Sequence, residues 1–219
     1  VPFVAGRIDR VGIPGIRFTD GPRGVALGAS TAFPVAIARA ATWDPDLERT
    51  VADAIGAEAR AQGANLWAGI CVNIAYSPGW GRVQESYGED PVLVGSMGAA
   101  AVDGINPWVM SCVKHFALNS MEESRFRVDV RVAEDVLREV FLPQFRTVVE
   151  AGVDCVMSAY NSVNGTWAGQ NQHLLTEILR GDWDFTGFVM TDFIWGLRDP
   201  VGSVAAGQDL EMPFRQQRA

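Results

Sequence analysis

The chain has 219 residues, of which 48% are hydrophobic and 20% charged, and its formal net charge is −8 at pH 7. This is the composition of an ordinary globular protein that can bury one sizeable core. A negative net charge with scattered arginines argues against a nucleic-acid partner, and the absence of any run near the roughly 18 apolar residues of a membrane span argues against a membrane.

Short apolar runs alternate with amphipathic stretches along the chain. The apolar runs predict strands at 15–20, 66–74, 109–116, 154–160, 187–193 and 207–213. The amphipathic stretches predict helices at 43–63, from Pro91 onward, at 133–152 and at 173–183. Asp44 and Asp90 each precede a proline and are predicted N-caps. Pro143 should bend or divide its helix, because it has no N–H to donate.

The predicted fold class is α/β, and its leading version is a (β/α)8-type TIM barrel. The strands are near-continuous apolar runs, as in a parallel sheet covered on both faces, and no linker interrupts the alternation. Because 219 residues are few for that fold, we expect one incomplete barrel domain over 1–219, cut at both ends. The alternative is a doubly wound open sheet, although no G-x-G-x-x-G follows a strand.

Metal and cofactor chemistry have little support in the sequence. The three cysteines, Cys71, Cys112 and Cys155, lie inside apolar segments, and their spacing gives neither a disulfide framework nor a zinc site. There are two histidines and no H-E-x-x-H or phosphate-binding G-x-x-x-x-G-K-[ST] motif. We expect buried free thiols, no metal and no cofactor.

Residues of catalytic types follow the predicted strands where each strand ends. They are Asp20, Arg82, Lys114, His115, Tyr160, Asn161, Asp192 and Glu211. In a barrel these positions converge on the carboxyl rim, where active sites are built. Carboxylates, an arginine, aromatics and the chain's only lysine suit a neutral polyhydroxylated substrate.

Several motifs in register resemble the barrel domain of glycoside hydrolase family three, the β-glucosidase-like enzymes. In chain order they are "TDGPRG", "TAFPVAIARAATWD", "PGWGRVQESYGEDP", "VKHFALNSMEESR", "VMSAYNSVNG", "GFVMTDF" and "AGQDLEMP", and the resemblance covers about residues 12 to 214. It implies a retaining exo-acting β-glycosidase that hydrolyses terminal β-D-glucosyl residues through a covalent glycosyl-aspartate. The "KHFALN" segment favours the glucosidase branch over the β-N-acetylhexosaminidases, which carry "KHFPG".

The resemblance also implies roles for individual residues. Asp192, in "MTDF", would be the catalytic nucleophile. The other matching positions would bind the sugar or line its pocket: Asp20, Arg82, Lys114, His115, Arg125, Met157 and Tyr160. We expect Glu85 to orient Arg82, and Trp195, shortly after the nucleophile, is the candidate aromatic platform for the sugar.

The sequence departs from the family pattern in two places, and one catalytic part is missing. Tyr76 stands where many relatives have an arginine, and Asp184 stands where they usually have a helix-terminating glycine. In the glucosidase branch the acid/base resembles a glutamate from a second domain after the barrel, which is absent from these residues. We therefore expect a second domain or chain to supply the acid/base.

Two other interpretations stay open at the level of sequence. Lys114 at a barrel strand end could form a Schiff base with a carbonyl substrate. Alternatively, the barrel could be a non-catalytic fragment that binds sugar and does no chemistry.

Overall fold

The computed structural model describes residues 3–213, and a curled six-stranded sheet lies at its centre. The strands run in the order β1 (Phe3–Ala5), β2 (Ile16–Thr19), β3 (Leu66–Cys71), β4 (Met110–Phe116), β6 (Cys155–Ser158) and β9 (Phe188–Met190). All neighbours from β2 to β9 pair in parallel, and β1 pairs antiparallel with β2. The spatial order follows the chain order without reversal, so the doubly wound alternative is wrong.

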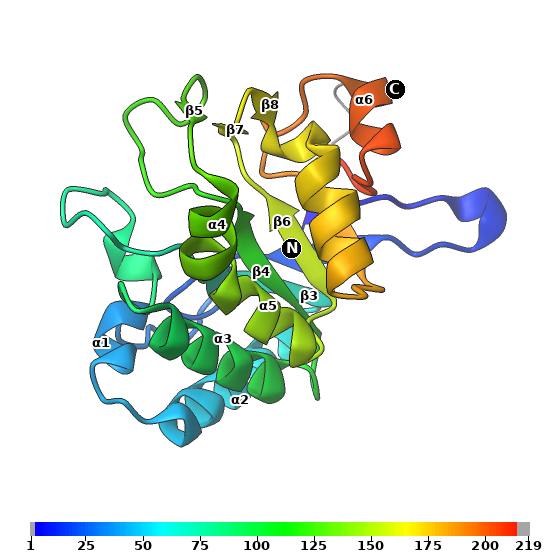
Figure 1. Ribbon diagram of the computed structural model, residues 1–219. Coiled ribbons are helices and arrows are strands. Elements are labelled where there is room, and N and C mark those ends of the chain that lie inside the picture. The colour runs from blue at the N-terminus through cyan, green and yellow to red at the C-terminus, as the bar shows by residue number, and fades with distance from the viewer. Residues whose placement is uncertain (1–2, 214–219) are drawn as a thin grey trace.

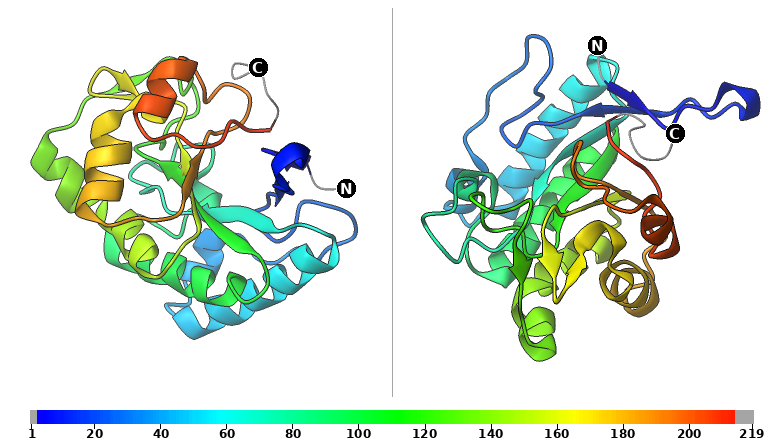
Figure 2. Two further views of the ribbon diagram at one scale, coloured as in Figure 1. Left: turned by 90° about the vertical axis from the view of Figure 1, so that its right-hand side faces the viewer. Right: turned by 90° about the horizontal axis from the view of Figure 1, so that it is seen from above.

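Helices cover the outer side of the curl (Figure 1). The long ones are α2 (Pro45–Ala61), α3 (Pro91–Ile105), α5 (Pro143–Glu150) and η5 (His173–Asp182). They form an arc around the parallel strands (Figure 2), in which α2 packs on α3 and α3 on α5. A curled parallel sheet with an outer helical layer is part of a (β/α) barrel, which confirms the predicted α/β class and the incomplete barrel.

Two predicted helix starts are confirmed by their caps. Asp44 Oδ1 accepts from the Leu47 N–H (3.0 Å) ahead of α2. Asp90 Oδ1 accepts from the N–H groups of Val92 (2.8 Å) and Leu93 (2.9 Å) ahead of α3. In both helices proline occupies the first turn, where its missing N–H leaves no partner unsatisfied.

The predicted helix 133–152 is divided at Pro143, as expected. A single turn, α4 (Glu134–Val136), leads into a π-helical stretch, η3 (Leu137–Phe141), and α5 begins at Pro143. Because proline cannot continue the i→i−4 ladder, the preceding turns widen before a new helix starts. The predicted helix 173–183 is present as η5, but it too is π-helical, which the apolar pattern did not predict.

The prediction of a strand at 207–213 is wrong. Only Leu210 forms a bridge, to Met190 of β9. The N–H groups of Asp209 and Leu210 both donate to Val189 O, at 2.9 and 3.1 Å. Since two successive amides converge on one acceptor, the ladder does not propagate.

The sequence pattern missed several short elements. They are β5 (Asp129–Val130), β7 (Ser162–Val163), β8 (Thr166–Trp167), α1 (Ala36–Ala40), α6 (Pro200–Ala205), η1 (Asp9–Val11), η2 (Val83–Glu85) and η4 (Ala168–Gln170). The strands β5, β7 and β8 form a separate three-stranded sheet beyond the carboxyl ends of β4 and β6 (Figure 1). This small sheet braces the loops that follow those two strands.

The core has two parts, one on each side of the curled sheet. Along β4 and β6, Val113 and Val156 face the helices, whereas Cys112 and Cys155 face the inside of the curl. This alternation follows from the two-residue period of a strand. All three cysteines are buried and free, as predicted. None of the helices in residues 3–213 has the length and apolar character that crossing a bilayer requires.

Asp184, just after η5, has a backbone conformation that favours glycine. Its φ is +53°, in the left-handed region that most side chains avoid. Aspartate is among the residues that tolerate this conformation best, so the chain can end η5 here without a glycine.

His173, the first residue of η5, joins two acidic residues on the outer surface. Its Nδ1 lies 2.6 Å from Glu177 Oε2 and its Nε2 lies 3.0 Å from Glu134 Oε1, which ties η5 to α4. The hydrogen bond to Glu177, assisted by Glu134 and opposed by burial, raises the pKa of His173.

We expect the stabilisation from His173 to be lost as pH rises. The charged ring is held in the folded state, so its contribution is fully present below the unfolded pKa of about 6.5 and disappears above the higher folded pKa. Because the groups are substantially exposed, H173A should lower the unfolding free energy by only about 0.5–1 kcal/mol in acid. Denaturant titrations of both proteins at several pH values check this, and a difference independent of pH would contradict it.

Candidate active site

A cavity of about 360 Å³ opens at the carboxyl ends of the parallel strands. It is lined by Asp20, Arg82, Glu85, Lys114, His115, Glu122, Arg125, Met157, Tyr160, Asp192 and Phe193. Parallel strands carry their carboxyl ends to one edge, so residues as far apart in the chain as Asp20 and Asp192 line one space. Of the residues to which the resemblance assigns a role, all except Trp195 line this cavity. Asn161 and Glu211, which were also expected at this rim, are not among the lining residues.

Trp195 lies outside the cavity walls. It follows β9 in a tight turn, in which its N–H donates to Phe193 O (2.7 Å), and 57% of its surface is exposed. Phe193 takes the place beside the nucleophile candidate instead. The role of Trp195 as a sugar platform stays a prediction.

Asp192 is a buried carboxylate with one oxygen held and the other without a partner. Oδ1 accepts from the Phe193 N–H (2.7 Å). Oδ2 has no hydrogen-bond partner among the described residues and lies 3.7 Å from His115 Nε2. Burial raises the pKa of Asp192 to about 6, against the opposing effects of the Phe193 N–H, Arg82 and Lys114. An unsatisfied buried oxygen is costly, which makes Asp192 a candidate functional group.

Each cation in the cavity already has its own carboxylate. The pairs are Lys114 Nζ with Asp20 Oδ1 (2.7 Å), Arg82 Nη2 with Glu85 Oε2 (2.8 Å) and Arg125 Nη1 with Glu122 Oε2 (2.9 Å). The bidentate contact from Glu85 to Arg82 agrees with the orienting role expected for Glu85. Within residues 3–213, Asp192 is therefore the one lining carboxylate without an arginine or lysine partner.

Lys114 is held as a charged group. Its side chain is 1% exposed, and it extends from the end of β4 to Asp20. Burial lowers its pKa, but the charge of Asp20 and the hydrogen bond to it outweigh burial, so the pKa is raised overall. An ammonium group in this state donates hydrogen bonds and has no lone pair for attack on carbon.

His115 is held neutral, with a defined tautomer. Asn73 Nδ2 donates to His115 O (2.8 Å), and Asn73 Oδ1 accepts from the His115 N–H (2.8 Å), which fixes the orientation of the amide. The same Oδ1 lies 3.2 Å from Nδ1, so Nδ1 carries the proton and Nε2 is an acceptor. Burial, with Arg82 and Lys114 nearby, keeps the pKa of His115 well below its usual range. Asn73 was missed in the sequence, where it lies inside an apolar run.

Tyr160 and Met157 complete the wall next to Asp192. The Tyr160 hydroxyl donates to Phe193 O, and burial raises the pKa of Tyr160. The Arg125 guanidinium lies 4.9 Å from the centre of the Tyr160 ring. Met157 is 2% exposed and belongs to the hydrophobic cluster inside the curled sheet. The described residues contain no group of three or more His, Cys, Asp and Glu side chains placed to hold a metal ion.

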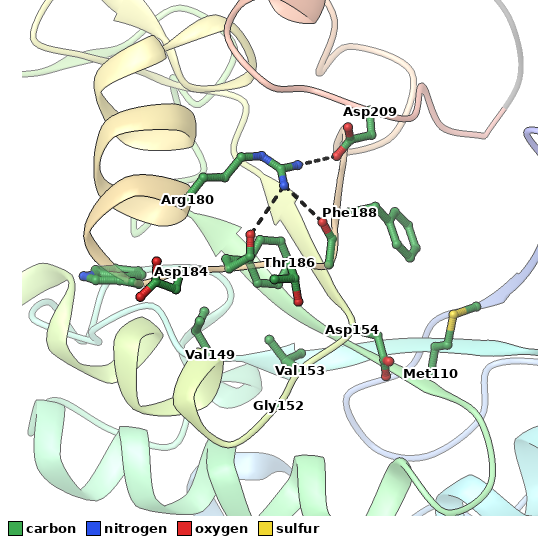
Figure 3. A pocket seen from close by; sticks show the side chains of 13 residues that line it. Met110, Val149, Gly152, Val153, Asp154, Arg180, Asp184, Thr186, Phe188 and Asp209 are labelled. Carbon is green, nitrogen blue, oxygen red and sulfur yellow. Dashed lines mark hydrogen bonds and ion pairs between the residues drawn. The ribbon is translucent and has the colours of Figure 1, made fainter.

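A larger hollow of about 800 Å³ lies at the opposite edge of the sheet (Figure 3). It is lined by residues at the amino ends of β4, β6 and β9, among them Met110, Asp154 and Phe188. Arg180 crosses it to Asp209 Oδ2 (2.7 Å) and to Gly187 O (3.2 Å). Its arginine is paired with Asp209, and Asp154 Oδ2 accepts from the Ser111 N–H (3.0 Å), so its volume does not make it the better candidate.

Comparisons with known proteins agree with this geometry. The family model described as the glycosyl hydrolase family 3 N-terminal domain matches residues 4–215. A β-glucosidase of Rhizobium radiobacter is 42% identical over 215 residues, covering 94% of this chain and 26% of that protein. Thermostable β-glucosidase B of Acetivibrio thermocellus is 38% identical, with coverages of 94% and 29%.

Solved structures give the same result. β-Glucosidase 3B from Thermotoga neapolitana, in complex with glucose, is 40% identical with a TM-score of 0.92, covering 95% of this chain and 31% of that one. The β-glucosidase from Kluyveromyces marxianus, also in complex with glucose, is 35% identical with a TM-score of 0.94, and the coverages are 99% and 27%. The chain thus spans between a quarter and a third of the length of these relatives.

Proposed function

Since the chain belongs to glycosyl hydrolase family 3 and matches its N-terminal domain, we propose that it supplies the sugar pocket and the nucleophile of a β-glucosidase. The observation that carries the proposal is Asp192, whose Oδ2 is buried without a partner in a cavity where every other carboxylate is paired. The relatives named as β-glucosidases, and the two solved with glucose, support the choice of sugar.

The proposed reaction is a retaining hydrolysis in two steps. Asp192 Oδ2 attacks the anomeric carbon, the bond to the aglycone oxygen breaks, and that oxygen takes a proton from an acid. Water then attacks the anomeric carbon, gives a proton to the same group acting as base, and releases Asp192. The Phe193 N–H, which holds Oδ1, leaves Oδ2 directed at the substrate.

The paired groups around Asp192 would bind the sugar hydroxyls. Lys114 and Arg82 offer N–H donors, and Asp20 and His115 Nε2 offer acceptors. The cavity lies at the small end of ligand pockets, which span about 300–1,000 Å³, and this favours one terminal sugar over a longer chain. That size supports exo action on one terminal sugar, and the relatives named as β-glucosidases support a β-D-glucosyl residue.

The acid/base is proposed to come from outside this cavity. Glu85 and Glu122 each hold an arginine, and Asp20 holds Lys114, so none of them is free to serve a leaving group. A second domain or chain supplying a carboxyl group would complete the site. Residues 1–219 by themselves should then hydrolyse an unactivated disaccharide poorly.

Labelling with a 2-deoxy-2-fluoro β-glucoside that carries a dinitrophenyl leaving group tests the proposal. Such a leaving group needs little help from an acid, so the label reports on the nucleophile alone. We expect mass spectrometry of proteolytic fragments to find the fluoroglucosyl adduct on Asp192. Binding without an adduct would favour a sugar-binding module. In a separate experiment, borohydride trapping of a carbonyl substrate on Lys114 would favour Schiff-base chemistry. The ion pair between Lys114 and Asp20 argues against that outcome.

A further inference from the structure

The side chain of Glu122 joins two loops at the cavity wall. Its Oε1 accepts from Trp80 Nε1 (3.1 Å), on the loop between β3 and α3. Its Oε2 pairs with Arg125 Nη1 (2.9 Å), on the loop after β4. Trp80 is 4% exposed and packs against Cys71 and Ala75, so it gives Glu122 a rigid anchor.

Arg125 is in turn stacked on the wall that holds the nucleophile. Its guanidinium carbon lies 4.9 Å from the ring centres of both Phe126 and Tyr160. These are cation–π distances, which fix the plane and position of the guanidinium. The Tyr160 hydroxyl donates to Phe193 O, and the Phe193 N–H donates to Asp192 Oδ1. A continuous set of contacts therefore runs from Glu122 to the nucleophile.

The charge of Glu122 matters as much as its contacts. Burial and the nearby charges of Arg82, Lys114 and Arg125 all lower the pKa of His115, so three cations gather around this cavity. Glu122 is the ion-pair partner of Arg125. Without that partner, mutual repulsion among the cations would favour a guanidinium that turns away from Tyr160.

We propose that Glu122 is a positioning residue, which fixes Arg125 over Tyr160 and thereby holds the wall beside Asp192 in its reactive geometry. The proposal rests on the function proposed above. Glu122 does not act as the acid/base, because both of its oxygens already accept from Trp80 and Arg125.

The test compares E122Q with E123Q in the protein as its full reading frame encodes it. Glu123 is the neighbouring carboxylate and is exposed, so E123Q removes the same charge without touching the contacts described. With an aryl β-glucoside, E122Q should lower kcat/KM by about 10- to 100-fold, the range expected when a reactive group is misplaced by about 1 Å. E123Q should leave kcat/KM within about twofold of the unchanged protein.

A double-mutant cycle separates positioning from a general structural role. If Glu122 acts through Arg125, the variant E122Q/R125M should be no less active than R125M alone. Additive losses would overturn the proposal. Dependence on the leaving group separates positioning from proton donation. E122Q should lose activity equally on activated and unactivated glucosides. A loss confined to unactivated glucosides would also overturn the positioning proposal.

Thermal melts accompany each variant, and E122D replaces E122Q should the latter not fold. E122D keeps the charge but cannot reach both partners, so the same direction of loss is expected. If E122Q behaves like E123Q while Asp192 is still labelled by the fluoroglucoside, only the positioning proposal fails. If Asp192 is not labelled in the unchanged protein, the proposed function fails first.

Discussion

Replacing Asp192 by asparagine is expected to abolish hydrolysis and, at the same time, to stabilise the fold at neutral pH. Loss of an enzyme's nucleophile lowers kcat by a factor on the order of 10⁴ to 10⁶. The gain in stability follows because Asp192 is buried with Oδ2 unpartnered, and its pKa is raised from 3.8 to about 6. The folded state therefore resists ionisation of this group, and asparagine removes the penalty.

The sign and the pH range of the stability effect follow from the same shift. A carboxyl group whose pKa is higher in the folded state destabilises the fold as pH rises from the unfolded value of 3.8, and the loss is complete above about 6. D192N should therefore unfold with about 1–3 kcal/mol more free energy than the unchanged protein at pH 8, and with a smaller difference at pH 4.5. Guanidinium titrations at both pH values measure this.

Two further measurements test whether Asp192 is the nucleophile. D192E keeps the charge but displaces the carboxylate by one methylene, so it should lose activity without gaining stability. In the unchanged protein, kcat/KM should fall as pH drops through about 6, because attack requires ionised Asp192. Activity of D192N within tenfold of the unchanged protein would show that another group is the nucleophile.

The parts of the fold that could be predicted from sequence are those decided by local chemistry. The N-caps Asp44 and Asp90 and the apolar runs of β3 and β4 specify their elements within a few residues. The failed strand at 207–213 is different, because whether an edge segment pairs depends on which amides reach β9. Hydrophobic pattern carries no information on that register.

The site residues that could be predicted are those at the ends of strands. The cavity contains Asp20, Lys114 and Asp192 because parallel strands bring their carboxyl ends together. The positioning role proposed for Glu122 was not predicted, since it depends on Trp80, 42 residues away, and on the path of two loops. Trp195 was predicted by its distance from Asp192 in the chain, but the turn after β9 leaves it outside the cavity.

The second large effect is expected at a buried ion pair between α1 and α2. The side chains of Arg39 and Glu48 are 3% and 2% exposed, and they form two hydrogen bonds, Nε to Oε2 (2.6 Å) and Nη2 to Oε1 (3.1 Å). The Tyr87 hydroxyl also donates to Oε1 (2.7 Å). Arg39 Nη1 donates to the carbonyls of Pro22 (3.2 Å) and Pro34 (2.5 Å), which hold both ends of the loop after Asp20.

Removing either partner should destabilise the protein by about 3–5 kcal/mol, because the remaining charge is left buried and unpaired. R39M and E48Q are therefore expected to lose far more stability than R146M, which breaks the Arg146–Glu150 pair on the surface and should cost less than about 1 kcal/mol. The double variant R39M/E48M should recover part of the loss, since it leaves no charge behind. Denaturant unfolding of the four variants measures these differences, and equal losses for R39M and R146M would contradict the expected role.

Since the Pro22 carbonyl lies two residues from Asp20, R39M should also weaken substrate binding through the displaced Asp20–Lys114 pair, and the double variant should not restore it.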